Sequence, residues 1–180
     1  SLFAVLAYFR HDILQLLVGW LKNLTQRQTS EDSRLAWLII IATVPGALAG
    51  LFANDLVENY ARSGYVIGST STLFALLLWY ADKRVGPGRS LSELTWRQAL
   101  FVGFAQALAL IPGTSRSGIT MTAALFCGLT RQAAAKLSFF LAIPIIFGSF
   151  TLRGTELVNA GTPEGYLLPL AYGVFVSGLV

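Results

Sequence analysis

The residues of this sequence that could do chemistry are concentrated in one short stretch, PGTSRSG at residues 112–118. Arg116 is permanently charged, and hydroxyl side chains surround it in sequence: Thr114, Ser115 and Ser117. The segments on both sides, 98–111 and 119–130, carry no charged side chain. An arginine buried in a membrane costs about 2.5–3.5 kcal/mol on insertion scales, so it is retained where it has a carboxylate partner or binds an anion. Apart from Asp82 at a helix end, no acidic residue lies within an apolar run, so an anion site is predicted.

The neighbours of Arg116 suit a phosphate group. Glycine lets the backbone approach a ligand closely, and a helix expected to begin near Gly118 would add free N–H groups and the positive end of its dipole. The planar guanidinium fork matches phosphate oxygens. The candidate catalytic residues are Arg116, Ser115 and Ser117, and the candidate substrate-binding residues are Thr114, Gly113, Gly118 and Gln106.

A simpler interpretation of the stretch stays open. In it Ser117 only caps a helix, the glycines only form a turn, and Arg116 pairs with another segment of the protein. Gln106, on the preceding helix, either faces the same cavity or bonds between helices. His11 is expected to be a solvated or interfacial side chain, and Cys127 a packed, inert thiol.

Composition indicates a membrane protein. Of the 180 residues, 54% are hydrophobic and 12% are charged, whereas soluble domains carry about a quarter charged residues. The basic residues lie in short turns between apolar runs rather than in one stripe, so we expect no nucleic-acid partner. With one cysteine and one histidine, the chain can form neither an internal disulfide nor a Cys/His metal cluster.

The apolar runs predict an all-α integral membrane protein with kinked transmembrane helices. Runs that can cross a hydrocarbon core of about 30 Å, or begin such a crossing, are 35–53, 65–80, 132–152 and 164–180. Kinks are expected at Pro45 and Pro144. The other pieces are expected to be the end of a spanning helix at 1–9, an exit to water at 10–12, an interfacial helix at 13–21, a polar connection at 22–34, a charged turn at 54–64 and a return to water at 81–97, with Ser92 or Thr95 as a helix cap. Both ends fall inside apolar runs, so we expect one polytopic membrane domain, 1–180, truncated at both ends.

The segment 98–130 is expected to be a re-entrant helical hairpin. Its two halves, 98–111 and 119–130, reach only about 18–21 Å each as helices, which is short of the core thickness. Irregular backbone such as the turn between them is tolerated at membrane depth where it lines a cavity. Charge supports this topology, because a full crossing would place Arg131 and Lys136 on the side opposite to most basic residues.

The motifs carry a resemblance to a known family. QALALIPGTSRSG at 106–118 is similar to the second signature of the undecaprenyl-pyrophosphate phosphatases, also called bacitracin-resistance proteins. LSFFLAIP at 137–144 and TWRQA at 95–99 support the resemblance, which runs from residue 1 to residue 180. It matches Arg116 to the family's essential arginine, and Ser115 and Ser117 to the hydroxyls that flank it.

The resemblance implies a multi-pass enzyme of the bacterial inner membrane, built as an inverted repeat of which this chain holds the second half. It implies hydrolysis of undecaprenyl pyrophosphate to undecaprenyl phosphate and inorganic phosphate, which recycles the carrier lipid for cell-wall synthesis. A divalent cation, Mg²⁺ or Ca²⁺, is implied as cofactor. Its ligands are expected in the family's first signature, with paired glutamates and a histidine, before residue 1. His11 does not match that histidine, so this chain alone is expected to be inactive.

Other functions would make some of the same demands on the sequence as hydrolysis. A polyprenyl-phosphate transporter would use the same inverted repeat and the same anion-binding arginine, and it stays the alternative. An acid-phosphatase-like enzyme would need at least two catalytic histidines, and a non-catalytic scaffold would leave Arg116 without an anion. The expected partners are the polyprenyl pyrophosphate lipid and membrane lipids, and a homo-oligomer is left open.

Overall fold

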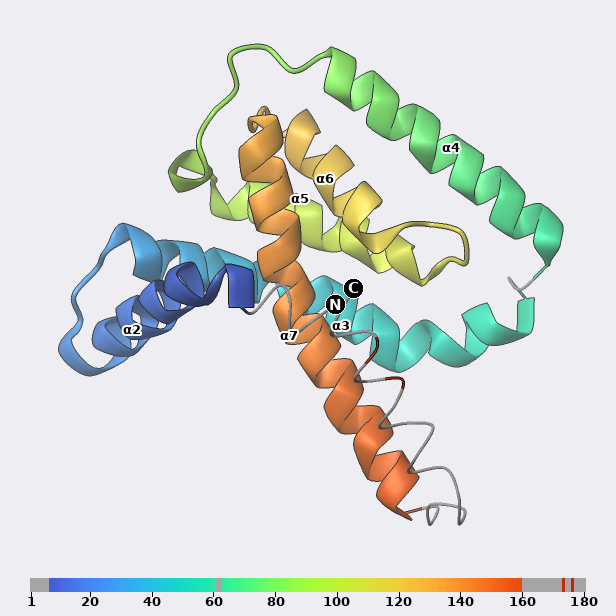
Figure 1. Cartoon of the computed structure of the whole chain (residues 1–180), viewed down its shortest axis with the longest axis horizontal. Coiled ribbons are helices and arrows are strands. Elements are labelled where there is room, and N and C mark those ends of the chain that lie inside the picture. Colours follow the sequence, from blue (N-terminus) through green and yellow to red (C-terminus); the bar gives the residue numbers. More distant parts are fainter. Residues whose placement is uncertain (1–6, 61–62, 160–172, 174–175, 177–180) are drawn as a thin grey trace.

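The structure, a computed structural model, describes residues 7–60, 63–159, 173 and 176. Within these residues the chain is helical and contains no strand, only an isolated bridge between Arg89 and Leu129. The elements, which Figure 1 displays in order along the chain, are α2 Arg10–Gln26, α3 Glu31–Tyr60, α4 Gly64–Lys83, the 3₁₀ turn η1 Leu91–Glu93, α5 Trp96–Ala107, the 3₁₀ turn η2 Leu108–Leu110, α6 Arg116–Phe126 and α7 Arg131–Asn159.

Three of these helices are long and apolar enough to cross a membrane. The candidate spans are Glu31–Phe52 in α3, Gly64–Lys83 in α4 and Arg131–Ser149 in α7. They coincide with the runs predicted to cross at 35–53, 65–80 and 132–152, and they are consistent with a helical membrane protein. The predictions for residues 1–6 and for the crossing at 164–180 lie outside the described residues, apart from 173 and 176.

The predicted polar connection at 22–34 is wrong in extent, because most of it is helical. α2 continues to Gln26 and ends at Arg27, whose φ of 53° is left-handed. α3 begins at Glu31, where the side chain of Ser30 accepts the N–H of Ser33 at 3.1 Å. Acidic residues in the first turn of a helix favour its positive N-terminal end, which explains why so polar a sequence starts a helix.

Two other predicted non-helical segments are also largely helical in the structure. The interfacial helix predicted at 13–21 lies within the longer α2, and the exit predicted at 10–12 is its first turn. Of the charged turn predicted at 54–64, residues up to Tyr60 belong to α3 and Gly64 begins α4. A helix that outruns the apolar core keeps its backbone hydrogen bonds while its charged side chains reach water. Pro45 and Pro144 lie inside α3 and α7, and the kinks at these residues stay predictions.

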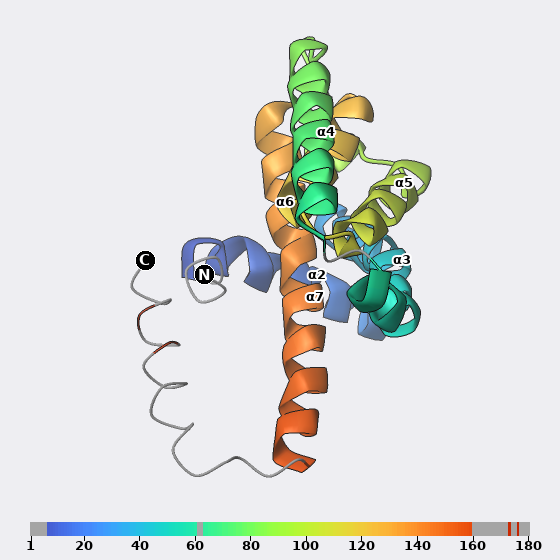
Figure 2. The ribbon, with the colours of Figure 1, turned by 90° about the vertical axis from the view of Figure 1, so that its right-hand side faces the viewer.

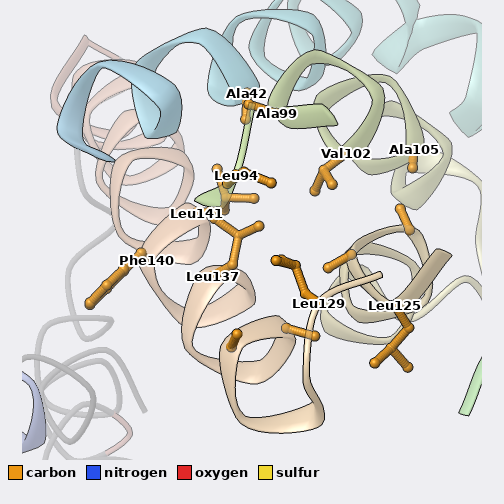
Figure 3. Packing of buried hydrophobic residues seen from close by; sticks show 14 of the residues in the cluster. Ala42, Leu94, Ala99, Val102, Ala105, Leu125, Leu129, Leu137, Phe140 and Leu141 are labelled. Carbon is orange, nitrogen blue, oxygen red and sulfur yellow. The ribbon is translucent and has the colours of Figure 1, made fainter. Parts of the chain in front are cut away.

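The buried core lies where α3, α5, α6 and α7 meet (Figures 1 and 3). Small residues let α3 and α5 approach closely: a Cβ added to Gly103 would lie 2.4 Å from the carbonyl oxygen of Ala42. α6 packs between α7 and α4 (Figure 1), and α4 lies in front of α6 in the view of Figure 2. The largest fully buried apolar side chains are Leu94, Leu129, Leu137, Leu141 and Val102.

The α5–α6 segment leaves and returns at the same end of the molecule. Arg131, at the start of α7, forms an ion pair with Asp82 near the end of α4, and its Nη2 donates to the Asp82 carbonyl oxygen at 3.0 Å. The N–H of Arg89 donates to the Gly128 carbonyl at 2.8 Å, and the N–H of Thr130 donates to the Arg89 carbonyl at 3.0 Å. These contacts close the base of a helical hairpin whose turn lies at 111–115. As predicted, Thr95 caps α5 by accepting the N–H of Gln98.

Candidate functional site

The site is built on the N-terminus of α6. The side chain of Ser115 caps this helix by accepting the N–H of Gly118 at 3.3 Å. The helix therefore begins at Arg116, two residues before the predicted start near Gly118, and Ser115 rather than Ser117 is the cap. A serine with extended backbone geometry before a helical run satisfies one of the first free N–H groups. In the described part of the chain no hydrogen bond uses the N–H groups of Arg116 and Ser117, so both remain available to an anion.

The turn before the helix depends on Gly113. Its φ of +90° is a conformation that side chains rarely adopt. The Thr114 N–H donates to the Ile111 carbonyl at 3.1 Å and closes the turn. A Cβ on Gly113 would lie 2.4 Å from the Thr70 Oγ1 atom and 2.5 Å from the Ile67 carbonyl oxygen. Gly113 is thus required both by its φ and by the close approach of α4.

Arg116 is half-buried and carries a charge that the described side chains do not neutralise. Among those side chains, no carboxylate lies within 4.0 Å of its guanidinium. The flanking hydroxyls of Ser115 and Ser117 are exposed, and their Oγ atoms lie 3.3 Å apart. A cation, two hydroxyls and a helix N-terminus therefore occur together, as expected for an anion site.

Thr114 and Gln106 are more deeply buried than expected. Their exposed fractions are 8% and 3%, and neither the Thr114 Oγ1 atom nor the two amide atoms of Gln106 has a hydrogen-bond partner in the described part. Buried polar atoms without partners cost about 1–3 kcal/mol each. Gln106 faces α3, since a Cβ on Gly46 would lie 2.9 Å from the Gln106 Nε2 atom. No described hydrogen bond joins Gln106 to the turn, whereas the other six candidates are consecutive residues, 113–118, at the end of the turn and the start of α6.

One buried pair of hydroxyls, which could not be predicted from sequence, supports the first turn of α6. Thr120 Oγ1 lies 2.8 Å from Ser138 Oγ of α7. The Thr120 hydroxyl also donates to the Arg116 carbonyl at 2.9 Å, and Ser138 reaches the Ser117 carbonyl at 3.4 Å. Nothing in the spacing of these two residues along the chain indicates that they meet.

A second missed pair lies on α4. Thr70 Oγ1 donates to the Pro112 carbonyl at 2.7 Å, and Ser71 Oγ donates to the Gly113 carbonyl at 2.9 Å. Here the sequence did hold a signal, because 69–72 is a run of four hydroxyl residues, STST, inside an apolar helix. Hydroxyls at membrane depth usually bond to a neighbouring helix or back to their own.

The other chemically active residues lie away from the turn. His11 is exposed on α2, where its Nε2 accepts from Arg10 at 3.4 Å. Burial raises the pKa of the Cys127 thiol, and the nearby Arg89 guanidinium offsets this only in part. A raised pKa leaves less thiolate, which agrees with an inert cysteine.

The described residues contain no group of three or more His, Cys, Asp or Glu that could hold a metal ion. The donors around Arg116 are hydroxyls, N–H groups and a guanidinium. A hard divalent cation binds carboxylate and carbonyl oxygens, so the residues of this site fit an anion and do not fit the cation.

Comparison with known protein families finds a match over the whole chain. A family model described as bacitracin resistance protein BacA matches residues 1–180, which is the whole chain. The match includes the hairpin turn, the helix that begins at Arg116 and the segments of α4 and α7 that contact them. It confirms the resemblance that the motif at 106–118 carries.

Proposed function

Since the chain belongs to the BacA family of bacitracin resistance proteins, which are undecaprenyl-pyrophosphate phosphatases, we propose that it hydrolyses undecaprenyl pyrophosphate. The products are undecaprenyl phosphate and inorganic phosphate. One observation supports a site at particular residues: Arg116, at the start of α6, is half-buried and has no carboxylate partner among the described side chains. The family match gives the transport alternative no support over hydrolysis.

In the proposed reaction, a water oxygen forms a bond to the terminal phosphorus while the bond from that phosphorus to the bridging oxygen breaks. The bridging oxygen leaves with the lipid monophosphate, and the water protons pass to the products and solvent. Negative charge grows on the phosphoryl and bridging oxygens along this path, so catalysis depends mainly on positioning and charge stabilisation.

Each candidate residue has a role in this proposal. Arg116 donates two parallel hydrogen bonds to phosphate oxygens. The N–H groups of Arg116 and Ser117, with the hydroxyls of Ser115 and Ser117, stabilise the charge that develops. Thr114 offers a hydroxyl that has no partner in the described part of the chain, Gly113 lets the turn approach α4, and Gly118 leaves room beside Ser115. Gln106 binds substrate in this proposal through an amide that has no partner in the described part.

The site lacks a nucleophile paired with a base. No described hydrogen bond joins Ser115 or Ser117 to a His, Asp or Glu side chain, and neither serine is activated by its neighbours. We therefore propose that the base comes from outside residues 1–180 and that these residues alone release no phosphate from the lipid.

The hairpin of α5 and α6 is proposed to be re-entrant, with its base on the cytoplasmic side of a multi-pass inner-membrane protein. Two ion pairs support this, Asp82 with Arg131 and Asp12 with Lys136 at 2.6 Å, because they join groups that the charge pattern assigns to one side. Thr70, which contacts the turn, lies about 18 Å along α4 from Asp82 at 1.5 Å per residue. That depth is more than half of a core of about 30 Å.

The proposal is tested with the full-length protein in liposomes that contain undecaprenyl pyrophosphate. We expect release of one inorganic phosphate for each lipid monophosphate formed. The movement of the lipid between leaflets is measured in the same vesicles. Lipid movement without phosphate release would refute hydrolysis in favour of transport.

A further inference from the structure

The turn at 111–115 is hydrogen-bonded to α4, which lies more than forty residues earlier in the chain. The Pro112 carbonyl accepts from Thr70 Oγ1 at 2.7 Å and the Gly113 carbonyl accepts from Ser71 Oγ at 2.9 Å. Among the described residues these two carbonyls have no other hydrogen-bond partner. Two consecutive carbonyls of one turn are therefore satisfied by two consecutive hydroxyls of α4.

The remaining hydroxyls of the same run behave differently. Ser69 donates to the Val66 carbonyl at 3.1 Å and Thr72 donates to the Gly68 carbonyl at 2.8 Å. Both bonds stay inside α4, as is usual for serine and threonine in helices. The Thr70 proton can also return to the Val66 carbonyl at 2.7 Å, but that carbonyl belongs to the helix ladder, whereas the Pro112 carbonyl depends on Thr70.

These two bonds fix the direction of the peptide groups next to the anion site. A trans peptide places C=O and N–H on opposite sides, so a Pro112 carbonyl that points to α4 turns the Gly113 N–H away from α4. No described hydrogen bond uses that N–H. A carbonyl oxygen facing a pyrophosphate would repel it, and a free N–H would attract it.

We propose that Thr70 and Ser71 are positioning residues, which hold the turn so that the Pro112 and Gly113 carbonyls face α4 and the Gly113 N–H stays available to the phosphates. This inference rests on the proposed function. Gly113 makes the contact possible, because a Cβ there would lie 2.4 Å from Thr70 Oγ1. Neither residue touches the substrate; both act through the backbone that precedes Arg116.

The test compares matched variants of the full-length protein in steady-state phosphate release. Thr70→Val and Ser71→Ala remove the hydroxyls, and Thr72→Val and Ser69→Ala remove neighbouring hydroxyls that bond only within α4. Small displacements of catalytic groups can cost up to about 100-fold in rate. We expect kcat of the Thr70→Val/Ser71→Ala variant to fall at least about tenfold. The two control variants should keep the kcat of the unmodified protein.

Hydroxyl-retaining variants separate positioning from a merely structural role. The Thr70→Ser and Ser71→Thr variants should keep the kcat of the unmodified protein, because their hydroxyls can donate the same hydrogen bonds to the turn. The proposal is overturned if the double variant melts at a lower temperature but keeps its kcat. It is also overturned if the control variants lose as much of their kcat as the double variant does. If the double variant does not fold, the isosteric Thr70→Val alone decides the question on the same criteria. Arg116→Ala is measured in parallel: full activity there contradicts the proposed function, whereas an inactive Arg116→Ala beside a fully active double variant contradicts this inference alone.

Discussion

Gly113→Ala is the substitution whose effect the structure determines most closely. A left-handed backbone conformation costs a residue with a Cβ about 1–2 kcal/mol. The new methyl group would also lie 2.5 Å from the Ile67 carbonyl oxygen, which is fixed in the backbone of α4, and overpacking of this kind costs about 1–3 kcal/mol. We expect a loss of about 3 kcal/mol in the free energy of unfolding. This corresponds to a fall of about 6–12 °C in Tm for a chain of this size.

The assay is thermal unfolding of the full-length protein in detergent, with Gly68→Ala as the matched control. Gly68 lies in the same region of α4, and a Cβ there meets nothing within 4 Å. Alanine is favoured over glycine inside a helix by about 1 kcal/mol, so the control should be as stable as the unmodified protein or slightly more stable. If the Gly113→Ala variant has the same Tm and the same activity as the unmodified protein, the turn is not packed against α4 and the reasoning is wrong.

Two further predictions concern the support of the site and its cofactor. Thr120→Val and Ser138→Ala should each destabilise the protein by about 0.5–1.5 kcal/mol, since each removes the hydrogen bond between the two buried hydroxyls and leaves the other hydroxyl with only a backbone carbonyl as acceptor. The double variant should lose less free energy of unfolding than the two single variants together, by about 0.5–1.5 kcal/mol. If the two losses simply add in chemical denaturation, the hydrogen bond between Thr120 and Ser138 does not contribute to stability. For the cofactor, a chelator should abolish phosphate release by the full-length protein, and added Mg²⁺ or Ca²⁺ should restore it. Unchanged turnover in the chelator would contradict the expected cation requirement.

The crossings could be predicted from sequence because the physical signal for them is local. A run such as 35–53 without a charge has one stable arrangement in a bilayer, a helix that satisfies its own backbone. The ends of helices were harder to predict. The charges of Glu31 and Asp32 predict a connection, yet these residues form the first turn of α3. Charge excludes a residue from the apolar core but does not prevent it from being helical.

The chemistry of the turn was visible in sequence, whereas its surroundings were not. Arg116 and its hydroxyls stand together along the chain, so the anion site could be predicted from the motif. The contacts that hold it come from Thr70 on α4 and Ser138 on α7. Hydrogen bonds between residues so distant in sequence leave no periodic pattern. Gln106 was placed on the correct helix, but its packing against Gly46 of α3 depends on how two helices approach each other.

Phosphate release from Arg116→Ala and Arg116→Lys in the full-length protein decides whether Arg116 binds and stabilises the phosphates. Removal of an arginine that stabilises transferring phosphate costs about 10³–10⁵ in kcat. We therefore expect Arg116→Ala to lose at least about 1,000-fold while it melts as the unmodified protein does. Arg116→Lys keeps the charge but not the planar fork, so it should recover only part of the loss. Turnover within about tenfold of the unmodified protein in a folded Arg116→Ala variant would contradict the account.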